Sequence, residues 1–337
     1  MIRTNSQIDV NGLRCLIVGH PSEPFYSLVD YRNSFLTSND VNKIIEFYCS
    51  LNDREELIQW MKERPKGVSY IREVEGDKNI VVVIPTADYN GKYAKNCREN
   101  IFKGLHIVFV ESGGRGDFYF NYAHNCNIGI RKAMEHNPKW IVLSNDDMYK
   151  IDGLGILKGG LSKVDNEKIK IVFTKYSRYH SYPSCVGRKR YILGELGYFV
   201  YNLIHGNLKT YSLFSRISRK YKIGYTLGPR NRLMSKIFLR ESLPFIMTGS
   251  FHILSGKFIT EVNEKLFDEG YINVVEDWES SINASFLKDA VGFVDYRIGD
   301  YIGGTMGMSQ ARSIRDVANL VYFNHRLPAV LSKATDS

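Results

Sequence analysis

The feature that most constrains this chain is an apolar run that ends in two adjacent carboxylates. Residues 140–144 have the length and composition of a buried strand, and Asp146 and Asp147 follow almost directly. Open α/β sheets bind ligands in the crevice outside the carboxyl ends of their strands, so both aspartates are predicted to face such a crevice. Carboxylates there can hold a divalent cation and, through it, a phosphorylated ligand. For an isolated Asp-Asp pair the alternative is a solvated acidic turn.

Two further strand-like runs precede this one. Residues 79–84 stop at Pro85-Thr86, and residues 106–110 stop at Glu111. The segments that follow them have apolar residues at helical spacing, and they cover residues 92–102 and 121–136. Strands that alternate with helices predict a parallel sheet whose strands end in polar loops at one edge.

The chain is expected to divide into three parts. Ser38-Asn39-Asp40 and Asn52-Asp53 offer caps for two short helices that run to Tyr48 and Glu63, and strands are predicted near 13–20 and 68–74. The expected domains are an N-terminal α/β accessory module over 1–77, a catalytic domain over 78–326 and a C-terminal tail over 327–337. Ser309 is predicted to cap a last helix that runs to about His325.

Composition is typical of a soluble enzyme. The chain has 337 residues, of which 44% are hydrophobic, and no window has the roughly 18 to 20 apolar residues of a membrane span. The N-terminus lacks a signal-peptide core, so we expect a cytoplasmic protein. Five cysteines, scattered and odd in number, indicate reduced structural thiols.

Positive charge is concentrated in one segment. Residues 178–247 contain 13 Lys or Arg and 2 Glu, a local charge of +11, so the rest of the chain carries 9 − 11 = −2. The segment also has 12 Tyr or Phe, and residues 191–204 are apolar enough for a core or a membrane interface. We expect a basic aromatic helical insertion that docks on an anionic membrane surface, as a peripheral protein on the inner face. The alternatives are a core helix with a solvated basic rim, or a stacking platform for nucleic acid, which is the less favoured partner.

Several motifs follow one another in order and carry a family resemblance. They are Pro85-Thr86 with Tyr89-Asn90, Asn127-Ile128-Gly129-Ile130, Asn145-Asp146-Asp147-Met148, Gly249-Ser250-Phe251, Phe267-Asp268-Glu269 and Glu276-Asp277. Over roughly residues 79–326 the series resembles the inverting nucleotide-sugar glycosyltransferases of the GT-A fold, family 2 type, with a rhamnosyltransferase-type Asn-x-Asp metal motif. The resemblance implies a GT-A-like Rossmann-type nucleotide-binding sheet flanked by helices.

The resemblance also implies a reaction and roles for residues. A sugar would move with inversion from a nucleoside-diphosphate sugar to a hydroxyl of a glycan, lipid-linked or protein acceptor. Asp147 would bind Mn²⁺ or Mg²⁺, Asp277 would be the general base, and Glu276 would support it. The donor-binding residues would be Pro85, Thr86, Tyr89, Glu111, Asn127, Asp146 and Gly249.

One departure from the family pattern and several alternatives accompany this interpretation. Many members have a His after the last core strand, but residues 301–309 contain none. Water could complete the metal shell, the metal could bind more weakly, or catalysis could be impaired. Three other functions stay open. One is a sugar-phosphate nucleotidyltransferase, although the Gly-rich, Arg-containing loop that such enzymes need after the first strand is absent here. The others are a nucleic-acid-binding protein and a catalytically silent relative that binds carbohydrate or nucleotide sugar. His252 is expected to be structural, and His124 to be a capping or solvent-facing residue.

Overall fold

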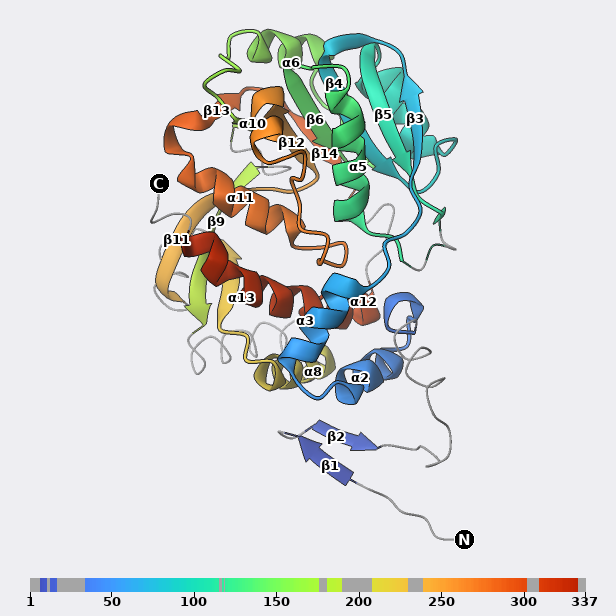
Figure 1. Cartoon of the computed structure of the whole chain (residues 1–337), viewed down its shortest axis with the longest axis vertical. Helices are drawn as coiled ribbons and strands as arrows, with labels where there is room; N and C mark the ends of the chain where they lie inside the picture. Colours follow the sequence, from blue (N-terminus) through green and yellow to red (C-terminus); the bar gives the residue numbers. More distant parts are fainter. Residues whose placement is uncertain are drawn as a thin grey trace.

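The structure, a computed structural model, describes residues 7–10, 13–16, 34–114, 117, 119–175, 181–189, 208–229, 239–301 and 309–332. Its centre is a mixed seven-stranded sheet with helices on both faces, in the order β13-β8-β12-β6-β4-β5-β3 (Figure 1). The strands are β3 (Tyr70–Val74), β4 (Asp77–Thr86), β5 (Leu105–Glu111), β6 (Trp140–Ser144), β8 (Ile171–Thr174), β12 (Phe251–Ser255) and β13 (Val291–Val294). The prediction of an α/β protein with helices around a Rossmann-like sheet is confirmed.

The three predicted parallel strands are adjacent in this sheet. β4 lies between β5 and β6 and runs parallel to both, whereas β12 is antiparallel to β6 and β3 is antiparallel to β5. The carboxyl ends of β4, β5 and β6 therefore meet at one edge. This edge carries the polar residues that follow each strand.

Alternate residues of the strands enter two different cores. In β4, Ile80, Val82 and Ile84 face α4 (Lys92–Asn96), the π-helical turn η1 (Cys97–Ile101) and α6 (Leu154–Leu161). Val81 and Val83 face α5 (Tyr122–Met134) and α10 (Gly256–Glu261) on the other side. Burial on both faces explains why the strand sequences are continuous apolar runs.

Helix α5 lies unusually close to the sheet at Gly129. A Cβ at this position would lie 2.4 Å from Val83 Cγ1 and 2.8 Å from Val110 Cγ2. Real side chains do not approach so closely, so only glycine fits between the helix and the two strands.

A third core gathers elements from both ends of the chain, which lie below the main sheet in Figure 1. It contains α2 (Val41–Ser50), α3 (Arg54–Glu63), α8 (Leu208–Lys220), α11 (Glu276–Phe286), α12 (Gln310–Arg315) and α13 (Val317–Ser332). Asp40 and Asp53 cap α2 and α3 as predicted. Residues 34–77, expected to form a separate module, thus share this core and the main sheet with the rest of the described chain.

The last predicted helix is two helices. Ser309 caps α12 as predicted, because its Oγ accepts from the Arg312 amide at 3.1 Å. The chain then turns at Asp316, and α13 continues beyond residue 326 to Ser332. The expected boundary of a tail at 327 thus falls inside a helix.

The basic segment 178–247 is only partly helical, so the expectation of a helical insertion is wrong in part. Besides α8 it contains an antiparallel sheet of β9 (Ser181–Lys189), β10 (Tyr225–Pro229) and β11 (Leu239–Thr248), in which β9 is central. Lys220 Nζ donates to the Tyr48 and Leu51 carbonyls at the end of α2. This lysine therefore holds the fold together and is not a free surface cation. The apolar run 191–204 lies outside the described residues.

Two short ladders complete the described strands. β1 (Gln7–Val10) pairs with β2 (Leu13–Leu16), the first four residues of the strand predicted over 13–20, and residues 17–20 lie outside the described part. β7 (Met148–Lys150) pairs with β14 (Ile298–Asp300).

The sequence also led to predictions about the cysteines and about membrane-spanning helices. Cys97, Cys126 and Cys185 are buried and form no disulfide, but Cys49 is disulfide-bonded, so the prediction of reduced thiols is wrong for this residue. Spacing along the chain cannot show which sulfurs become neighbours. Among the residues that the structure describes, no helix is long and apolar enough to cross a bilayer.

Candidate functional site

The carboxyl ends of the three parallel strands bring the predicted donor-site residues together. Thr86 is the last residue of β4 and pairs in register with Glu111 of β5. Its Oγ1 donates to Asp146 Oδ2 at 2.7 Å, across from β4 to the loop that follows β6. Thr86, Asp146 and Asp147 are all buried. Three polar residues separated by up to 61 positions thus lie at one end of the sheet.

The loop with the two aspartates is held through its backbone. The Asp146 carbonyl accepts from Cys97 Sγ at 3.2 Å, and the Asp147 carbonyl accepts from the Tyr301 amide at 2.9 Å. Asn96 Nδ2 donates to the Met148 carbonyl at 2.9 Å. These bonds fix the positions of the two carboxylates before any ligand binds.

Tyr89 and Glu111 contact each other and place an aromatic ring and a carboxylate at the same edge of the sheet as this loop. The Tyr89 amide donates to Glu111 Oε1 at 3.0 Å, and Arg72 Nε donates to Oε2 at 2.7 Å. Burial opposes ionisation of Glu111, but these two hydrogen bonds lower its pKa below the ordinary value. The guanidinium carbons of Arg98 and Arg72 lie 4.7 and 5.4 Å from the centre of the Tyr89 ring. Neither arginine was predicted from the sequence.

The turn between β11 and β12 lies next to the aspartates. The Asn145 amide donates to the Ser250 carbonyl at 3.0 Å, which ties this turn to the end of β6. Gly249 is half-buried, and a Cβ there would meet no atom of the described residues within 4 Å. Pro85 is buried within the sheet, opposite Val110. Pro85 therefore shapes the end of β4.

Asp300 is a carboxylate of the site region that the sequence interpretation missed. The pairing of β14 with β7 sets Asp300 opposite Met148, one residue after Asp147. Its Oδ2 accepts from Ser250 Oγ at 2.7 Å. Asp300 could have been found from its position at the end of the last strand-like stretch, because many members of the family that the motifs resemble have a His shortly after their last core strand.

The second acidic pair begins helix α11 after a strained residue. Val275 has φ of 82°, a left-handed conformation that is an outlier for a β-branched residue. Glu276 is buried, and its Oε2 has no hydrogen-bond partner among the described residues. Burial raises the pKa of Glu276 to about 7. Burial and the charge of Glu276 raise the pKa of Asp277 well above its ordinary value. One proton is therefore retained by this pair more tightly than by free carboxylates.

Tyr122 connects the two acidic regions. Its Oη donates to Asn145 Oδ1 at 2.8 Å, and its amide donates to Asn273 Oδ1 at 2.7 Å. Burial raises the pKa of the Tyr122 phenol, and the neighbouring Cys126, Glu276 and Asp277 add to the effect. Tyr122 is therefore close to the second acidic pair as well as bonded to the loop of the first.

Asn127 has a structural role in place of the predicted donor contact. It is fully buried, and its Nδ2 donates to the Phe267 carbonyl at 2.9 Å and to Glu269 Oε1 at 3.0 Å. Its Oδ1 accepts from the Phe267 amide at 3.1 Å. The side-chain amide of Asn127 therefore makes its hydrogen bonds inside the protein, and the expected contact with a nucleotide-sugar donor is not supported.

The two histidines of the sequence analysis also pack within the fold. His252 is buried in β12 with its ring 5.6 Å from that of Phe267. His124 lies in the first turn of α5, where its Nδ1 is 2.9 Å from Glu269 Oε2. His124 therefore pairs with a carboxylate.

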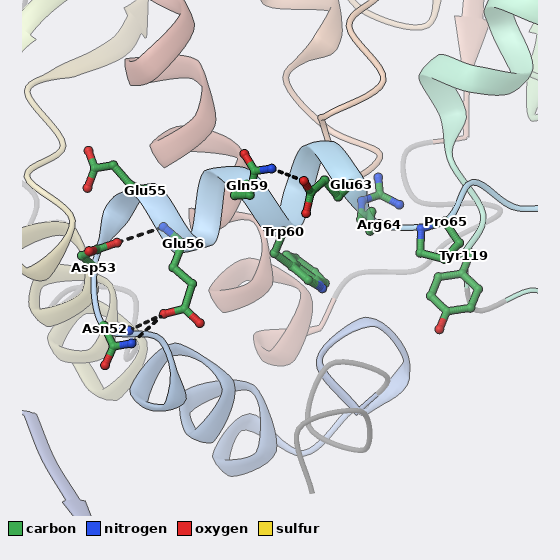
Figure 2. Close-up of a pocket in the computed structure, with 10 residues that line it drawn as sticks. All are labelled: Asn52, Asp53, Glu55, Glu56, Gln59, Trp60, Glu63, Arg64, Pro65 and Tyr119. Atoms are coloured by element: carbon green, nitrogen blue, oxygen red, sulfur yellow. Dashed lines mark hydrogen bonds between the residues drawn. The ribbon is translucent and has the colours of Figure 1, made fainter. Parts of the chain in front are cut away.

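A pocket of about 710 Å³ lies elsewhere, along α3 (Figure 2). Asp53, Glu55, Glu56 and Glu63 line it, but none of the predicted site residues does. Asp53 caps α3, and Glu56 accepts from the Asn52 amide at 2.8 Å (Figure 2). Two of its carboxylates thus serve the start of the helix, and we assign the pocket no chemistry.

No protein-family model matches this chain, and no curated protein matches its sequence. The functional interpretation therefore depends on the site residues and on the motif resemblance alone.

Proposed function

We propose that this protein is a metal-assisted glycosyltransferase that moves a sugar from a nucleoside-diphosphate sugar to a hydroxyl acceptor with inversion. The observation that carries the proposal is the meeting of Thr86, Asp146 and Asp147 at the carboxyl edge of the sheet, with Tyr122 between that edge and the Glu276-Asp277 pair. An acidic cation site and a separate proton acceptor are the two parts that metal-assisted sugar transfer with inversion uses. The GT-A-like fold and the hexosyltransferase type belong to the same proposal.

The first acidic region would bind the donor. Carboxylate oxygens are ligands that Mg²⁺ and Mn²⁺ prefer, and Asp147 would hold such an ion, with Asp300 as a carboxylate in place of the missing His. The bound ion would neutralise charge on the diphosphate leaving group. Asp146 would face the ribose or a metal-bound water, and Tyr89, flanked by Arg72 and Arg98, offers an aromatic surface for the base.

The second acidic region would accept the proton of the attacking hydroxyl. A general base is most effective when its pKa is near the working pH, and burial raises the pKa of Glu276 to about 7 and that of Asp277 in the same direction. Asp277 is the proposed base, and Glu276 tunes its proton affinity through charge.

A donor panel tests this proposal. Thermal unfolding would be measured with UDP-, GDP- and dTDP-sugars, each with and without Mn²⁺. A donor at 100 times its dissociation constant should stabilise the protein by about 2.7 kcal/mol, and only with metal. Asp147→Ala should abolish this metal-dependent shift. Asp165→Ala, which also removes a carboxylate but in a remote turn after α6, should retain it. If no donor shifts the transition, or if Asp147→Ala responds like the unaltered chain, the proposal is wrong.

Turnover separates an enzyme from a silent binding relative. Product formation would be followed with the donor that binds, against simple glycan and lipid-linked acceptors. Donor binding without transfer or hydrolysis would favour the silent relative. Salt-dependent binding of single-stranded nucleic acid with no donor binding would favour the nucleic-acid alternative.

For the acceptor we propose a lipid-linked molecule at an anionic membrane surface, where this protein would be peripheral and cytoplasmic. Arg216 in α8 and Lys222 just after α8 belong to the basic segment. Both are exposed, so they are available for contact with lipid headgroups. Each basic residue near an anionic leaflet contributes about 1 kcal/mol. Sedimentation with anionic vesicles at low salt should therefore weaken when both residues are changed to Glu, and neutral vesicles should bind neither protein. Equal sedimentation of the two proteins would exclude the idea.

A further inference from the structure

Two histidines and a glutamate converge at the end of the sheet opposite the proposed donor site. Glu73 belongs to the edge strand β3, His106 lies near the start of β5, and His136 follows the end of α5. The His106 and His136 Nε2 atoms lie 3.0 and 2.8 Å from the same Glu73 Oε2. The three possible ligand atoms all lie within 4.8 Å of one another. We propose that these residues bind one divalent transition-metal ion of the Zn²⁺ class.

The ligand set fits this kind of ion. Two imidazoles and one carboxylate form a set that Zn²⁺ uses in proteins, with water at the fourth position. A tetrahedral ion with bonds of about 2.0 to 2.1 Å holds its ligand atoms roughly 3.3 Å apart, so shifts of a few tenths of an ångström in the Glu73 side chain would open the space. Mixed nitrogen and oxygen ligands disfavour Mg²⁺ and Ca²⁺, which take oxygen.

The unbonded nitrogen of His106 supports a metal on the other one. His106 is fully buried, and its Nδ1 has no hydrogen-bond partner among the described residues, although Glu75 Oε2 lies 3.5 Å away. If Nε2 carries the only proton, Nδ1 is a buried acceptor that faces a carboxylate. A metal on Nε2 moves the proton to Nδ1, which can then donate to Glu75. Histidines that bind metals usually donate their other N–H in this way.

The rest of the surroundings orient Glu73. Lys132 Nζ lies 3.4 Å from Glu73 Oε1, the oxygen that neither histidine contacts, and 2.6 Å from Glu135 Oε2. Burial opposes ionisation of Glu73, yet His136, His106 and Lys132 together lower its pKa to about 2. The carboxylate is therefore ionised near neutral pH, as a metal ligand must be.

The proposed ion would fasten three elements together. β3 is an edge strand, bonded on one side only to β5, and α5 packs over both β4 and β5. A metal bound by Glu73, His106 and His136 would join β3, β5 and the end of α5. Such an ion would stabilise this end of the sheet, and the inference does not depend on the proposed glycosyltransferase activity.

Metal titration of the full chain tests the proposal. The protein would carry Asp147→Ala, so that the other acidic edge does not compete, and would be freed of metal with a chelator. We expect one equivalent of Zn²⁺ to bind, and Co²⁺ to give the visible absorption of a four-coordinate nitrogen–oxygen site. Glu73→Gln and His136→Ala should each weaken Zn²⁺ binding by about 100-fold or more, since even outer partners of ligands contribute 10- to 100-fold. Glu75→Gln should weaken it by about 10-fold.

The controls separate metal binding from folding. His325→Ala removes a histidine of α13 whose Nε2 lies 3.4 Å from Lys62 Nζ, and it should leave the affinity unchanged. Glu73 and His136 lie toward the surface, so their variants should fold, which circular dichroism and urea unfolding without metal would check. Absence of Zn²⁺ binding at micromolar free metal would overturn the proposal. Unchanged affinity in the Glu73→Gln, His136→Ala double variant would do the same.

Discussion

Replacement of Glu276 by Gln should stabilise the protein at alkaline pH, although the change removes a proposed catalytic group. The folded-state pKa of Glu276 is about 7, whereas the ordinary value is 4.5, and burial is the main cause. The folded state thus holds this proton more tightly than the unfolded state. Stability is therefore lost as the pH rises from 4.5 through 7, and the full penalty is present above 7.

The size of the effect follows from the same values. Each pKa unit corresponds to about 1.4 kcal/mol, so ionised Glu276 costs the folded state about 3 kcal/mol at pH 8 and nothing near pH 4.5. Gln keeps the shape of the side chain and removes the charge. We therefore expect Glu276→Gln to raise the free energy of unfolding by about 3 kcal/mol at pH 8 and to leave it unchanged at pH 4.5.

Urea unfolding at a series of pH values measures this difference. Glu279→Gln is the matched control, because Glu279 is also buried in α11 but is bonded to Arg326 Nη2 at 2.7 Å and to Tyr271 Oη at 2.9 Å. Loss of that ion pair should destabilise the protein at pH 8. Destabilisation by Glu276→Gln at pH 8, or an effect on the free energy of unfolding that does not change with pH, would contradict this expectation. If the protein transfers sugars, the variant's activity should also begin at lower pH, since Asp277 loses the neighbouring charge that raises its pKa.

Three further changes test other parts of the structure. Asp277→Asn should leave donor binding intact and slow transfer by roughly 10² to 10⁴, which single-turnover kinetics would show. Tyr122→Phe removes the bond to Asn145 and should cost about 1 kcal/mol of unfolding free energy while it lowers kcat more than it changes KM. Gly129→Ala forces a methyl group against Val83 and should destabilise by about 1 to 3 kcal/mol in urea unfolding, with no dependence on pH.

The elements that could be predicted from the sequence are those with local signals. β4, β5 and β6 were recognisable because a parallel strand buried on both faces is a continuous apolar run with a polar end. The caps Asp40, Asp53 and Ser309 were recognisable because each side chain bonds an amide two or three residues away. Thr86 and Asp146 each follow one of these apolar runs. Because the carboxyl ends of parallel neighbouring strands lie at one edge of the sheet, the two residues were expected to lie near each other there.

Contacts between distant residues left no such signal. Asp300 lies opposite Met148 only because β14 pairs with β7 across about 150 positions, and neither three-residue strand has a distinctive pattern. Asn127 resembled a ligand-binding residue, yet its amide matches the backbone of Phe267. His106 and His136 are 30 positions apart and have no metal-ligand spacing. The β9 sheet within the basic segment was missed because charge and aromatic content say little about strand pairing.

The Glu276-Asp277 pair lowers the stability of the folded protein. The buried carboxylate of Glu279 is compensated by Arg326. At Glu276 one oxygen is unbonded within the described chain, and the nearby buried Arg64 directs Nη2 to the Tyr271 carbonyl at 2.6 Å. The left-handed Val275 that precedes the pair adds strain of order 1 to 3 kcal/mol. Arg312 and Arg64 compensate the charge of Glu276 only in part, because its pKa is still raised. Strain and incompletely compensated charge persist in proteins mainly at functional sites, because a neutral Gln would otherwise be more stable. The Glu276-Asp277 pair is therefore the part of the chain whose retention most requires a chemical role, and proton acceptance is the role that its raised pKa values suit.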